Sequence, residues 1–227
     1  DTKPYVYTKV KQADGSEVDV KLLVDSGASH GLMLDVQADE KLKIPEKNVE
    51  SILGRGLGGT IVGQIGRVST LTLGDYSIND VITNYPGPDA YMDSIKYTLS
   101  FRHGSIGGEV LSRFNVIYNF PQEEMYLKRG NSFNKNFYYN MGGLTLKAIG
   151  SRLNRFEVTD VRANSSADKG GVKTGDILIK INNINAEELT LHQLNGFFNS
   201  HPGKKIILEI ERDGKRLKKE FRLESPI

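Results

Sequence analysis

The chain has 227 residues, of which 38% are hydrophobic and 26% are charged, and its formal net charge is +2. These values exclude an intrinsically disordered chain, give no reason to expect a nucleic-acid partner, and favour two modest domains. Because the chain has no cysteine and only four scattered histidines, disulfide bonds, zinc–thiolate sites and thiol nucleophiles are excluded, and we expect no metal ion and no cofactor.

The first 130 residues have the pattern of a β-rich domain. Runs of apolar and β-branched residues between turn signals predict strands, and these runs lie at 5–11, 17–24, 60–73, 81–85, 114–120 and 125–127. The Asp14-Gly15 pair predicts a hairpin turn between the first two strands, because glycine tolerates the positive φ of such turns. Short helices are expected at 109–113 and around 36–42.

A strand that ends at a carboxylate carries the main chemical signal. The segment 21–29 is an apolar run followed by Asp25, Ser26 and Gly27. Partial burial disfavours the charged form of a carboxyl group and raises its pKa, which suits acid–base chemistry when a partner group is present. Gly27 lets a substrate or another backbone approach closely. On residue types alone, the alternative is a loop carboxylate that caps a turn.

A glycine-rich segment, 53–63, follows and carries five glycines between strand-like flanks. A tip of this kind is flexible enough to act as a flap that closes over a peptide. A dinucleotide-binding fingerprint is excluded, because that glycine pattern opens a helix and a β pattern follows here. The alternative is a plain flexible turn.

The segment 104–114 completes the pattern, with Ile106 and Gly107 in a short strand-like run before the expected helix. The segment 23–28, Leu-Val-Asp-Ser-Gly-Ala, resembles the signature of the retropepsin-like aspartic peptidases. Residues 104–114 resemble the second signature of that family, although Ser105 stands at its first apolar position. The resemblance covers nearly all of residues 4–128 and implies a mainly β fold with a retropepsin-like acid-protease barrel.

The resemblance also implies roles for individual residues. Asp25 would be one of two carboxylates that hold the attacking water, and Ser26 would brace the paired motif between two lobes, with Gly27 beside them. The flap and substrate-binding residues would be Gly56, Leu57, Gly58, Gly59, Ile106 and Gly107. The implied activity is hydrolysis of peptide bonds by an Asp-activated water, with a polypeptide as the substrate.

The chain supplies only one such motif. Aspartic peptidases need two carboxylates that share a proton, and the other aspartates considered lie in turns or in the second half of the chain. The second carboxylate is therefore expected from a second copy of the chain, by two-fold symmetry, or from a lobe upstream of Asp1. The start of the chain directly before the lobe favours the upstream lobe, in which case this chain alone would be inactive.

The second half of the chain has a different pattern of predicted strands and helices. The Asn-rich segment 131–136 is interpreted as a linker between a domain at 1–130 and a smaller α+β domain at 137–227. Within the second domain, strands are predicted at 144–149, 156–161, 176–181, 206–211 and 215–223, and helices at 165–170 and about 191–199.

Two segments of this half resemble PDZ domains of the bacterial, peptidase-associated kind. Residues 141–144, Met-Gly-Gly-Leu, are similar to the carboxylate-binding loop, and 161–182 follows the family's Ser-Pro-Ala, Ala-Gly-apolar, Gly-Asp-apolar and Ile-Asn series with Ser166 in place of proline. In such a domain, an extended peptide adds a strand beside 144–149, and loop amides bind its C-terminal carboxylate. The peptide-binding residues would be Gly142, Gly143, Leu144, Leu146, Leu194 and Phe198.

Together the two resemblances predict an aspartic endopeptidase with a PDZ module that captures or presents substrates. Its partners would be a polypeptide substrate, a peptide or C-terminal ligand in the PDZ groove, and a second aspartic lobe. The alternative is a catalytically inactive peptide-binding scaffold built on the same two domains. The resemblance also implies an exported bacterial protein of the periplasm or cell envelope.

Overall fold

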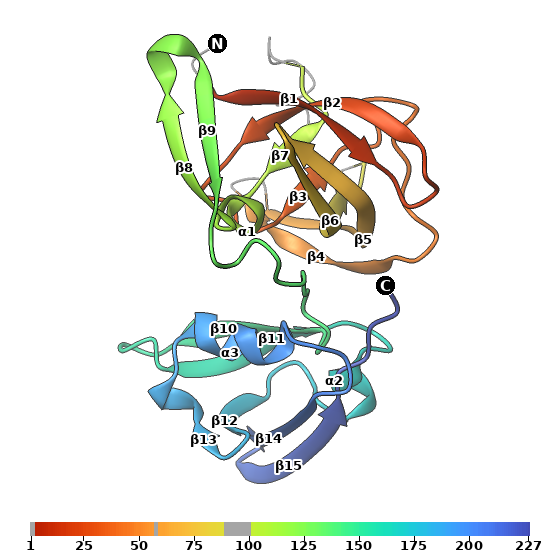
Figure 1. Ribbon diagram of the computed structural model, residues 1–227. Helices are drawn as coiled ribbons and strands as arrows, with labels where there is room; N and C mark the ends of the chain where they lie inside the picture. Colours follow the sequence, from red (N-terminus) through yellow and green to blue (C-terminus); the bar gives the residue numbers. More distant parts are fainter. Residues whose placement is uncertain (1–2, 57–58, 89–100) are drawn as a thin grey trace. The chain divides into compact units, whose positions relative to one another are not determined.

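The computed structural model describes residues 3–56, 59–88 and 101–227 (Figure 1). The chain divides into two compact units, Asp1–Phe137 with Ile227 and Tyr138–Pro226. Strands dominate both units, so the mainly β fold predicted from the sequence is confirmed. In the described part of the chain, no helix has the length and hydropathy needed to cross a bilayer.

The first unit is built on a sheet that closes on itself. Its strands are β1 (Tyr5–Lys11), β2 (Glu17–Val24), β3 (Leu32–Leu34), β4 (Val49–Gly56), β5 (Gly59–Leu73), β6 (Tyr76–Pro86) and β7 (Gly104–Ile106). Their order is β1-β2-β7-β3-β6-β5-β4, and β1 also pairs with β5. Six strands therefore form a closed barrel, with β4 attached to β5. Alternate residues of β2 are buried, as expected when one face of a sheet forms the core.

Several elements of this unit differ from the sequence prediction. Strands β3 and β7 have three residues each, too few for a hydrophobic pattern. Strand β3 was not predicted, and β7 was expected only from the family resemblance of residues 104–114. The helix expected around 36–42 is wrong: the segment forms turns. Asp35 accepts a hydrogen bond from the Gln37 N–H (2.9 Å), and Asp39 accepts one from the Lys41 N–H (2.8 Å). Such local carboxylate bonds compete with helix formation.

A helix and a hairpin follow the barrel strands. Helix α1 (Gly108–Leu111) leads into β8 (Phe114–Asn119), a 3-10 helix η1 (Phe120–Gln122) and β9 (Glu124–Arg129). Strands β8 and β9 form a separate two-stranded sheet. This hairpin agrees with the strands predicted at 114–120 and 125–127.

The segment after the hairpin is packed through Arg113, a buried side chain at the end of α1. Its guanidinium donates to the backbone carbonyls of Ser132, Phe133, Lys135 and Asn136. It also lies 3.4 Å from the centroid of the Phe137 ring. The segment interpreted as a linker, 131–136, therefore lies against the first unit, while the domain boundaries stay a prediction.

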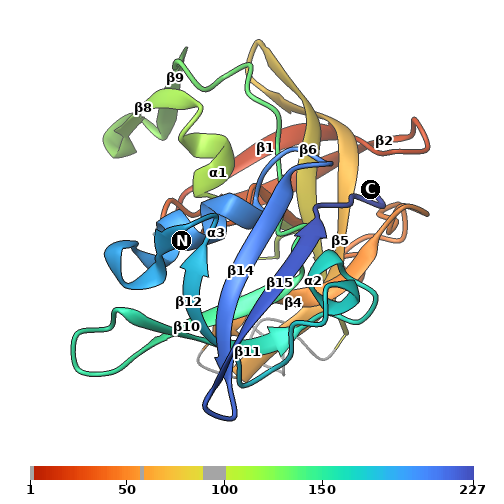
Figure 2. The same cartoon turned by 90° about the horizontal axis from the view of Figure 1, so that it is seen from below.

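The second unit is an antiparallel sheet with two short helices (Figures 1 and 2). In chain order its elements are β10 (Leu144–Ile149), β11 (Arg155–Val161), α2 (Ser166–Lys169), β12 (Ile177–Ile181), β13 (Ile184–Asn185), η2 (Ala186–Glu188), α3 (Leu191–Phe198), β14 (Lys205–Arg212) and β15 (Lys215–Arg222). The strand order is β10-β11-β12-β14-β15, with β13 paired to β12. Strand β10 is thus an edge strand, and α3 lies beside it.

Two groups of polar interactions stabilise this unit. Helix α3 begins at a capping box, in which Thr190 and Gln193 bond each other's backbone N–H groups. The Asp176 carboxylate is fully buried and accepts two hydrogen bonds from the Arg212 guanidinium, at 2.6 and 2.7 Å. It also accepts the N–H of Lys173 at 2.8 Å. The Gly-Asp pair recognised in the sequence thus ties the start of β12 to the end of β14.

Candidate functional site

Asp25 stands directly after β2, in a tight turn. Its Oδ1 accepts the N–H of Gly27 at 3.0 Å and the N–H of Ala28 at 3.2 Å. Its own N–H donates to the carbonyl of Ile106 at 2.9 Å. Asp25 is half-buried, and Ser26 and Gly27 are exposed. The turn therefore holds the carboxylate in one orientation at a place that solvent and substrate can reach.

Three backbone hydrogen bonds join the segment 25–31 to the segment after β7; because it carries the predicted catalytic residue Asp25, the segment 25–31 is called the catalytic turn. The N–H of Gly107 donates to Gly31 (2.9 Å), that of Gly108 to Ala28 (2.7 Å) and that of Glu109 to His30 (3.3 Å). A Cβ atom on Gly107 would lie 2.1 Å from the carbonyl oxygen of His30, so this approach requires glycine. The structure thus brings the predicted residues of the two signatures together, while the bracing role of Ser26 stays a prediction.

The sequence reasoning missed His30 as a member of this site. Its Nε2 lies 2.9 Å from the hydroxyl oxygen of Ser105, which is 6% exposed. Burial lowers the pKa of His30, and the negative charge of Asp25 acts in the opposite direction. The signal was present in the sequence, since Ser105 occupies a position where an apolar residue was expected. A buried hydroxyl at that position needs a polar partner, and His30 is that partner.

The predicted flap is the tip of the hairpin formed by β4 and β5. Gly56 pairs with Gly59 at the end of the ladder, and Gly59 has a φ of 114°, which glycine alone adopts freely. Leu57 and Gly58 lie outside the described residues. The hairpin geometry therefore agrees with a tip at this point, and its movement over a substrate stays a prediction.

The predicted carboxylate-binding loop precedes β10 and is closed by a side chain. Gly143 has a φ of 74°, and its N–H donates to Oδ1 of Asn140 at 2.8 Å. Nδ2 of Asn140 donates to the carbonyl of Leu144 at 2.7 Å. The N–H of Met141 donates to the carbonyl of Phe198 at 3.2 Å. At least one loop amide predicted to bind a ligand is therefore bonded within the chain.

The four residues predicted to line an apolar pocket lie together between β10 and α3. Leu144, Leu146, Leu194 and Phe198 are all buried, and each is less than a tenth exposed. A Cβ atom on Gly142 would lie 2.7 Å from the Phe198 ring, so the loop rests directly on this cluster. In this structure the four side chains form core rather than an open pocket.

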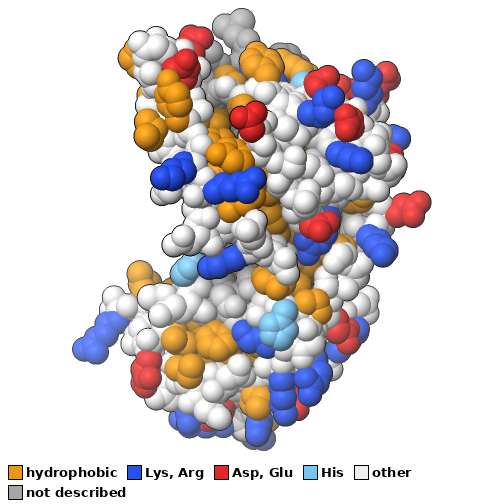
Figure 3. Space-filling model, in the orientation of Figure 1, with side chains coloured by type: hydrophobic (Ala, Val, Ile, Leu, Met, Phe, Trp, Pro, Cys, Tyr) orange, Lys and Arg blue, Asp and Glu red, His pale blue; other side chains and the backbone are white. Residues whose placement is uncertain are grey.

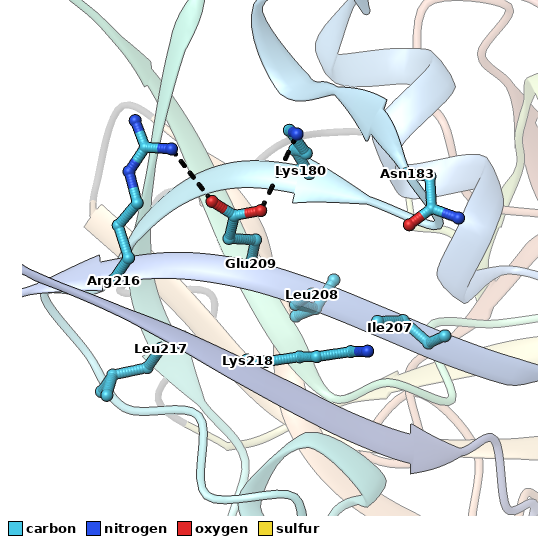
Figure 4. A pocket seen from close by; sticks show the side chains of 8 residues that line it. All are labelled: Lys180, Asn183, Ile207, Leu208, Glu209, Arg216, Leu217 and Lys218. Carbon is cyan, nitrogen blue, oxygen red and sulfur yellow. Dashed lines mark hydrogen bonds and ion pairs between the residues drawn. The ribbon is translucent and has the colours of Figure 1, made fainter.

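A separate cavity of about 280 Å³ lies on strands β12, β14 and β15 (Figure 4). Glu209 stands between two cations there, 3.1 Å from Arg216 and 3.9 Å from Lys180. All three side chains are substantially exposed, and exposed ion pairs contribute little to stability or recognition on their own. This cavity is distinct from both predicted sites.

Comparison with known families agrees with the family resemblances predicted for both halves of the chain. Residues 9–90 match the family model described as aspartyl protease, and residues 157–212 match the model described as PDZ domain. The chain thus has a segment that matches the aspartyl protease family, followed by a segment that matches PDZ domains. The expected order of a retropepsin-like lobe and a PDZ module is thereby confirmed. No curated protein matches the chain significantly.

Matches among solved structures include HtrA proteins, with TM-scores below 0.4. The HtrA3 PDZ domain bound to a phage-derived ligand, FGRWV, has 20% sequence identity, covers 38% of this chain and 84% of its own, and gives a TM-score of 0.31. The HtrA-type protease AlgW with a decapeptide has 15% identity, coverage of 98% and 79%, and a TM-score of 0.36. The serine endoprotease from Yersinia pestis has 14% identity, coverage of 98% and 85%, and a TM-score of 0.34.

Proposed function

We propose that the chain is the catalytic lobe and peptide-binding module of an aspartic endopeptidase, with Asp25 as one of the two catalytic carboxylates. The observation that carries this proposal is the catalytic turn. Two backbone N–H groups hold Oδ1 of Asp25, and the turn is bonded to β7 and α1. A capping carboxylate needs no such second connection, whereas a catalytic group must be held in a fixed geometry.

The chemistry requires a second carboxylate close to Asp25. In aspartic peptidases, one carboxylate takes a proton from the attacking water while the protonated partner polarises the scissile carbonyl, and the pair titrates as a unit. A single Asp25 carboxyl group cannot be ionised and protonated at the same time. The partner would come from Asp25 of a second copy of the chain or from an upstream lobe.

The β8–β9 hairpin supports the proposal of a partner lobe. It exposes four large hydrophobic side chains: Ile117 (66%), Phe120 (64%), Tyr126 (53%) and Tyr118 (37%). Figure 3 shows hydrophobic side chains gathered over this hairpin. A two-stranded sheet is marginally stable by itself, and clustered exposed apolar side chains are typical of interaction surfaces. A second lobe packed on the hairpin would bury these side chains.

The test is cleavage of an unstructured protein across roughly pH 3 to 8, a range that spans carboxyl pKa values raised by burial. The chain is assayed alone and together with any residues that its gene encodes upstream, with the mass in solution recorded. We expect Asp25→Asn to abolish cleavage without unfolding the protein. Asp35→Asn, a turn aspartate outside the site, is the matched control. Unchanged cleavage by Asp25→Asn would refute the assignment.

The second candidate is an inactive scaffold that binds peptides. The observation that favours it is the single catalytic motif of the chain. Peptide binding without cleavage, in both the chain and its native-length form, would select this alternative.

We also propose that the PDZ domain binds an extended peptide along β10 and that the protein works in the cell envelope of a bacterium. The first part is supported by the free edge of β10 and by the match of residues 157–212 to the PDZ family model. The second part rests on family resemblance and is tested by finding the native protein in envelope fractions. Recovery in the cytoplasmic fraction would contradict it.

A further inference from the structure

Strand β10 offers its free edge to a ligand from Leu144 onward. The carbonyl of Gly143 accepts the N–H of Arg162 at 2.7 Å, so Gly143 directs this group toward β11. Leu144 pairs with Val161. Because successive residues of an antiparallel strand direct their polar groups to opposite sides, the N–H and C=O of Leu144 point to the free edge. This is the first position at which an added strand would pair.

The Asn140 side chain already fills the hydrogen-bonding positions at this end of the groove. Its Oδ1 accepts the N–H of Gly143, as a carboxylate oxygen of a bound C-terminus would, and its Nδ2 donates to the C=O of Leu144, as the N–H of the last ligand residue would. Both distances are short, at 2.8 and 2.7 Å. One amide side chain therefore reproduces the polar pattern of a peptide's terminal residue.

Two further features support the interpretation that the chain itself fills the place of a terminal residue. Nη2 of Arg162 donates to the backbone carbonyl of Asn140 at 3.2 Å, which fixes the position from which the side chain reaches over the loop. The buried side chains of Leu144, Leu146, Leu194 and Phe198 occupy the apolar space beside the loop, where the side chain of a terminal residue would anchor. Both the polar and the apolar requirements of a C-terminal residue are thus met from within the chain.

We propose that the PDZ groove takes internal extended segments of a polypeptide and disfavours free C-termini, because the Asn140 side chain fills the place of a terminal residue. This inference rests on the proposed binding of peptides along β10. An internal segment that pairs with β10 beyond Leu144 leaves Asn140 in place. A free C-terminus has to displace it and loses the two hydrogen bonds that Asn140 makes.

Removal of the Asn140 amide should reverse the preference. The N–H of Gly143 would then lack its acceptor, and the guanidinium of Arg162 lies close to the loop. Charge-assisted hydrogen bonds to a carboxylate are about twice as strong as neutral ones. A free C-terminus would gain from both groups, whereas an internal segment carries no carboxylate and would gain nothing.

The experiment compares two synthetic decapeptide libraries with the same random core, using the full chain with Asp25→Asn so that no ligand is cleaved. One library ends in a free carboxylate, and in the other the core continues into a Gly-Ser tail that blocks its end. Selected sequences are resynthesised in both forms and their Kd values are measured by fluorescence anisotropy. Asn140→Ala is the test variant, and Asn154→Ala, in the loop between β10 and β11, is the matched control.

We expect the unchanged groove to bind the blocked form at least as tightly as the free acid. In Asn140→Ala the free acid should bind about tenfold more tightly than before, from the net worth of one to two hydrogen bonds, while the blocked form and the Asn154→Ala control stay unchanged. A tenfold preference of the unchanged groove for free acids, or weaker binding of free acids by a folded Asn140→Ala, would overturn the inference and leave peptide binding intact.

If Asn140→Ala fails to fold in a thermal scan, Asn140→Asp replaces it. This variant keeps the acceptor for the Gly143 N–H and adds a negative charge, so free acids should bind less tightly than to the unchanged groove. Tighter binding of free acids by Asn140→Asp would overturn the inference. Absence of binding by either library in every variant would overturn the proposed peptide groove itself.

Discussion

At the residue scale, the pairing of His30 with Ser105 distinguishes this catalytic turn. The two side chains join the turn to β7, in addition to the backbone bonds. Burial lowers the pKa of His30, and the negative charge of Asp25 acts against this lowering. A titratable side chain therefore stands within electrostatic reach of Asp25, the proposed catalytic carboxylate.

The first prediction concerns the pH dependence of stability. Because burial lowers the pKa of His30 in the folded state, the unfolded chain takes up this proton at higher pH than the folded chain. The free energy of unfolding should therefore fall as the pH is lowered through about 6.5, the unfolded value. Urea unfolding at pH 7.5 and 5.5 (roughly, on either side of that value) should show a smaller loss in His30→Gln. His201→Gln, at an exposed position, should behave like the unchanged chain, and equal losses in all three would contradict the prediction.

The second prediction concerns Gly107. A methyl group there would lie 2.1 Å from the His30 carbonyl, so Gly107→Ala must push β7 and the catalytic turn apart. We expect a loss of about 1 to 3 kcal/mol of unfolding free energy, measured by chemical denaturation, together with loss of cleavage in the assembled enzyme. Gly54→Ala, in the predicted flap segment, is the control for the unfolding free energy alone, because a Cβ atom at Gly54 meets nothing within 4 Å. An equal effect of both substitutions would show that the close approach at Gly107 is not what requires glycine.

At the element scale, the sequence pattern predicted the strands and hairpins that depend on residues close together in the chain. Strands β1 and β2 alternate, and the hairpins have recognisable turn residues, so these were predicted correctly. Strands β3 and β7 exist because neighbouring strands pair with them, and a three-residue segment carries no pattern of its own. The contact between the catalytic turn and β7 likewise depends on strand order. The family resemblance, and not periodicity, placed these two segments in one site.

The same limit applies to the PDZ loop. The Met-Gly-Gly-Leu segment was recognised, and the four apolar residues lie between β10 and α3 as expected. Asn140 was missed because its role depends on the direction of one amide side chain. A short polar residue next to a glycine turn is a frequent local capping group, which is the signal that could have identified it.

The third prediction concerns the tie between β12 and β14. Asp176 is fully buried, and its partner Arg212 is 22% exposed, so Asp176→Ala leaves the Lys173 N–H and a partly exposed guanidinium without their acceptor. We expect the PDZ domain to lose about 1 to 3 kcal/mol of unfolding free energy, measured by denaturation of the whole chain followed domain by domain. The control is Glu220→Ala, which breaks an exposed pair with Lys205 and should leave stability unchanged. A small effect of Asp176→Ala would mean that water replaces the ion pair.

At the scale of the whole molecule, the two domains contribute different halves of one proposed activity. In the proposed function, the protease domain supplies Asp25 as one of two catalytic carboxylates and needs a second lobe, and the PDZ domain offers the free edge of β10. If the groove holds an internal segment of an unfolded chain, the bound polypeptide continues on both sides of it. A peptidase can then cleave the same polypeptide on either side of the bound segment. If the groove held a C-terminus, only the part of the polypeptide that precedes the bound residues could be cleaved.

The last prediction tests the partner lobe through the β8–β9 hairpin. Ile117 is the most exposed hydrophobic side chain of this hairpin, and a charge there would have to be buried when a second lobe packs on it, at a cost of several kcal/mol. We expect Ile117→Asp to shift the assembled enzyme toward separate lobes and to lower cleavage in parallel, measured as mass in solution and cleavage rate over a range of concentrations. The chain itself should stay folded, because the side chain is exposed.

Leu153→Asp is the matched control, since Leu153 is similarly exposed on the PDZ domain. If the partner is a second copy of the chain, the loss of cleavage by Ile117→Asp should be reversed at high protein concentration, because association is governed by mass action. If the partner is an upstream lobe in the same polypeptide, the loss should not depend on concentration. Full assembly and full cleavage by Ile117→Asp would show that the second carboxylate reaches Asp25 by another surface.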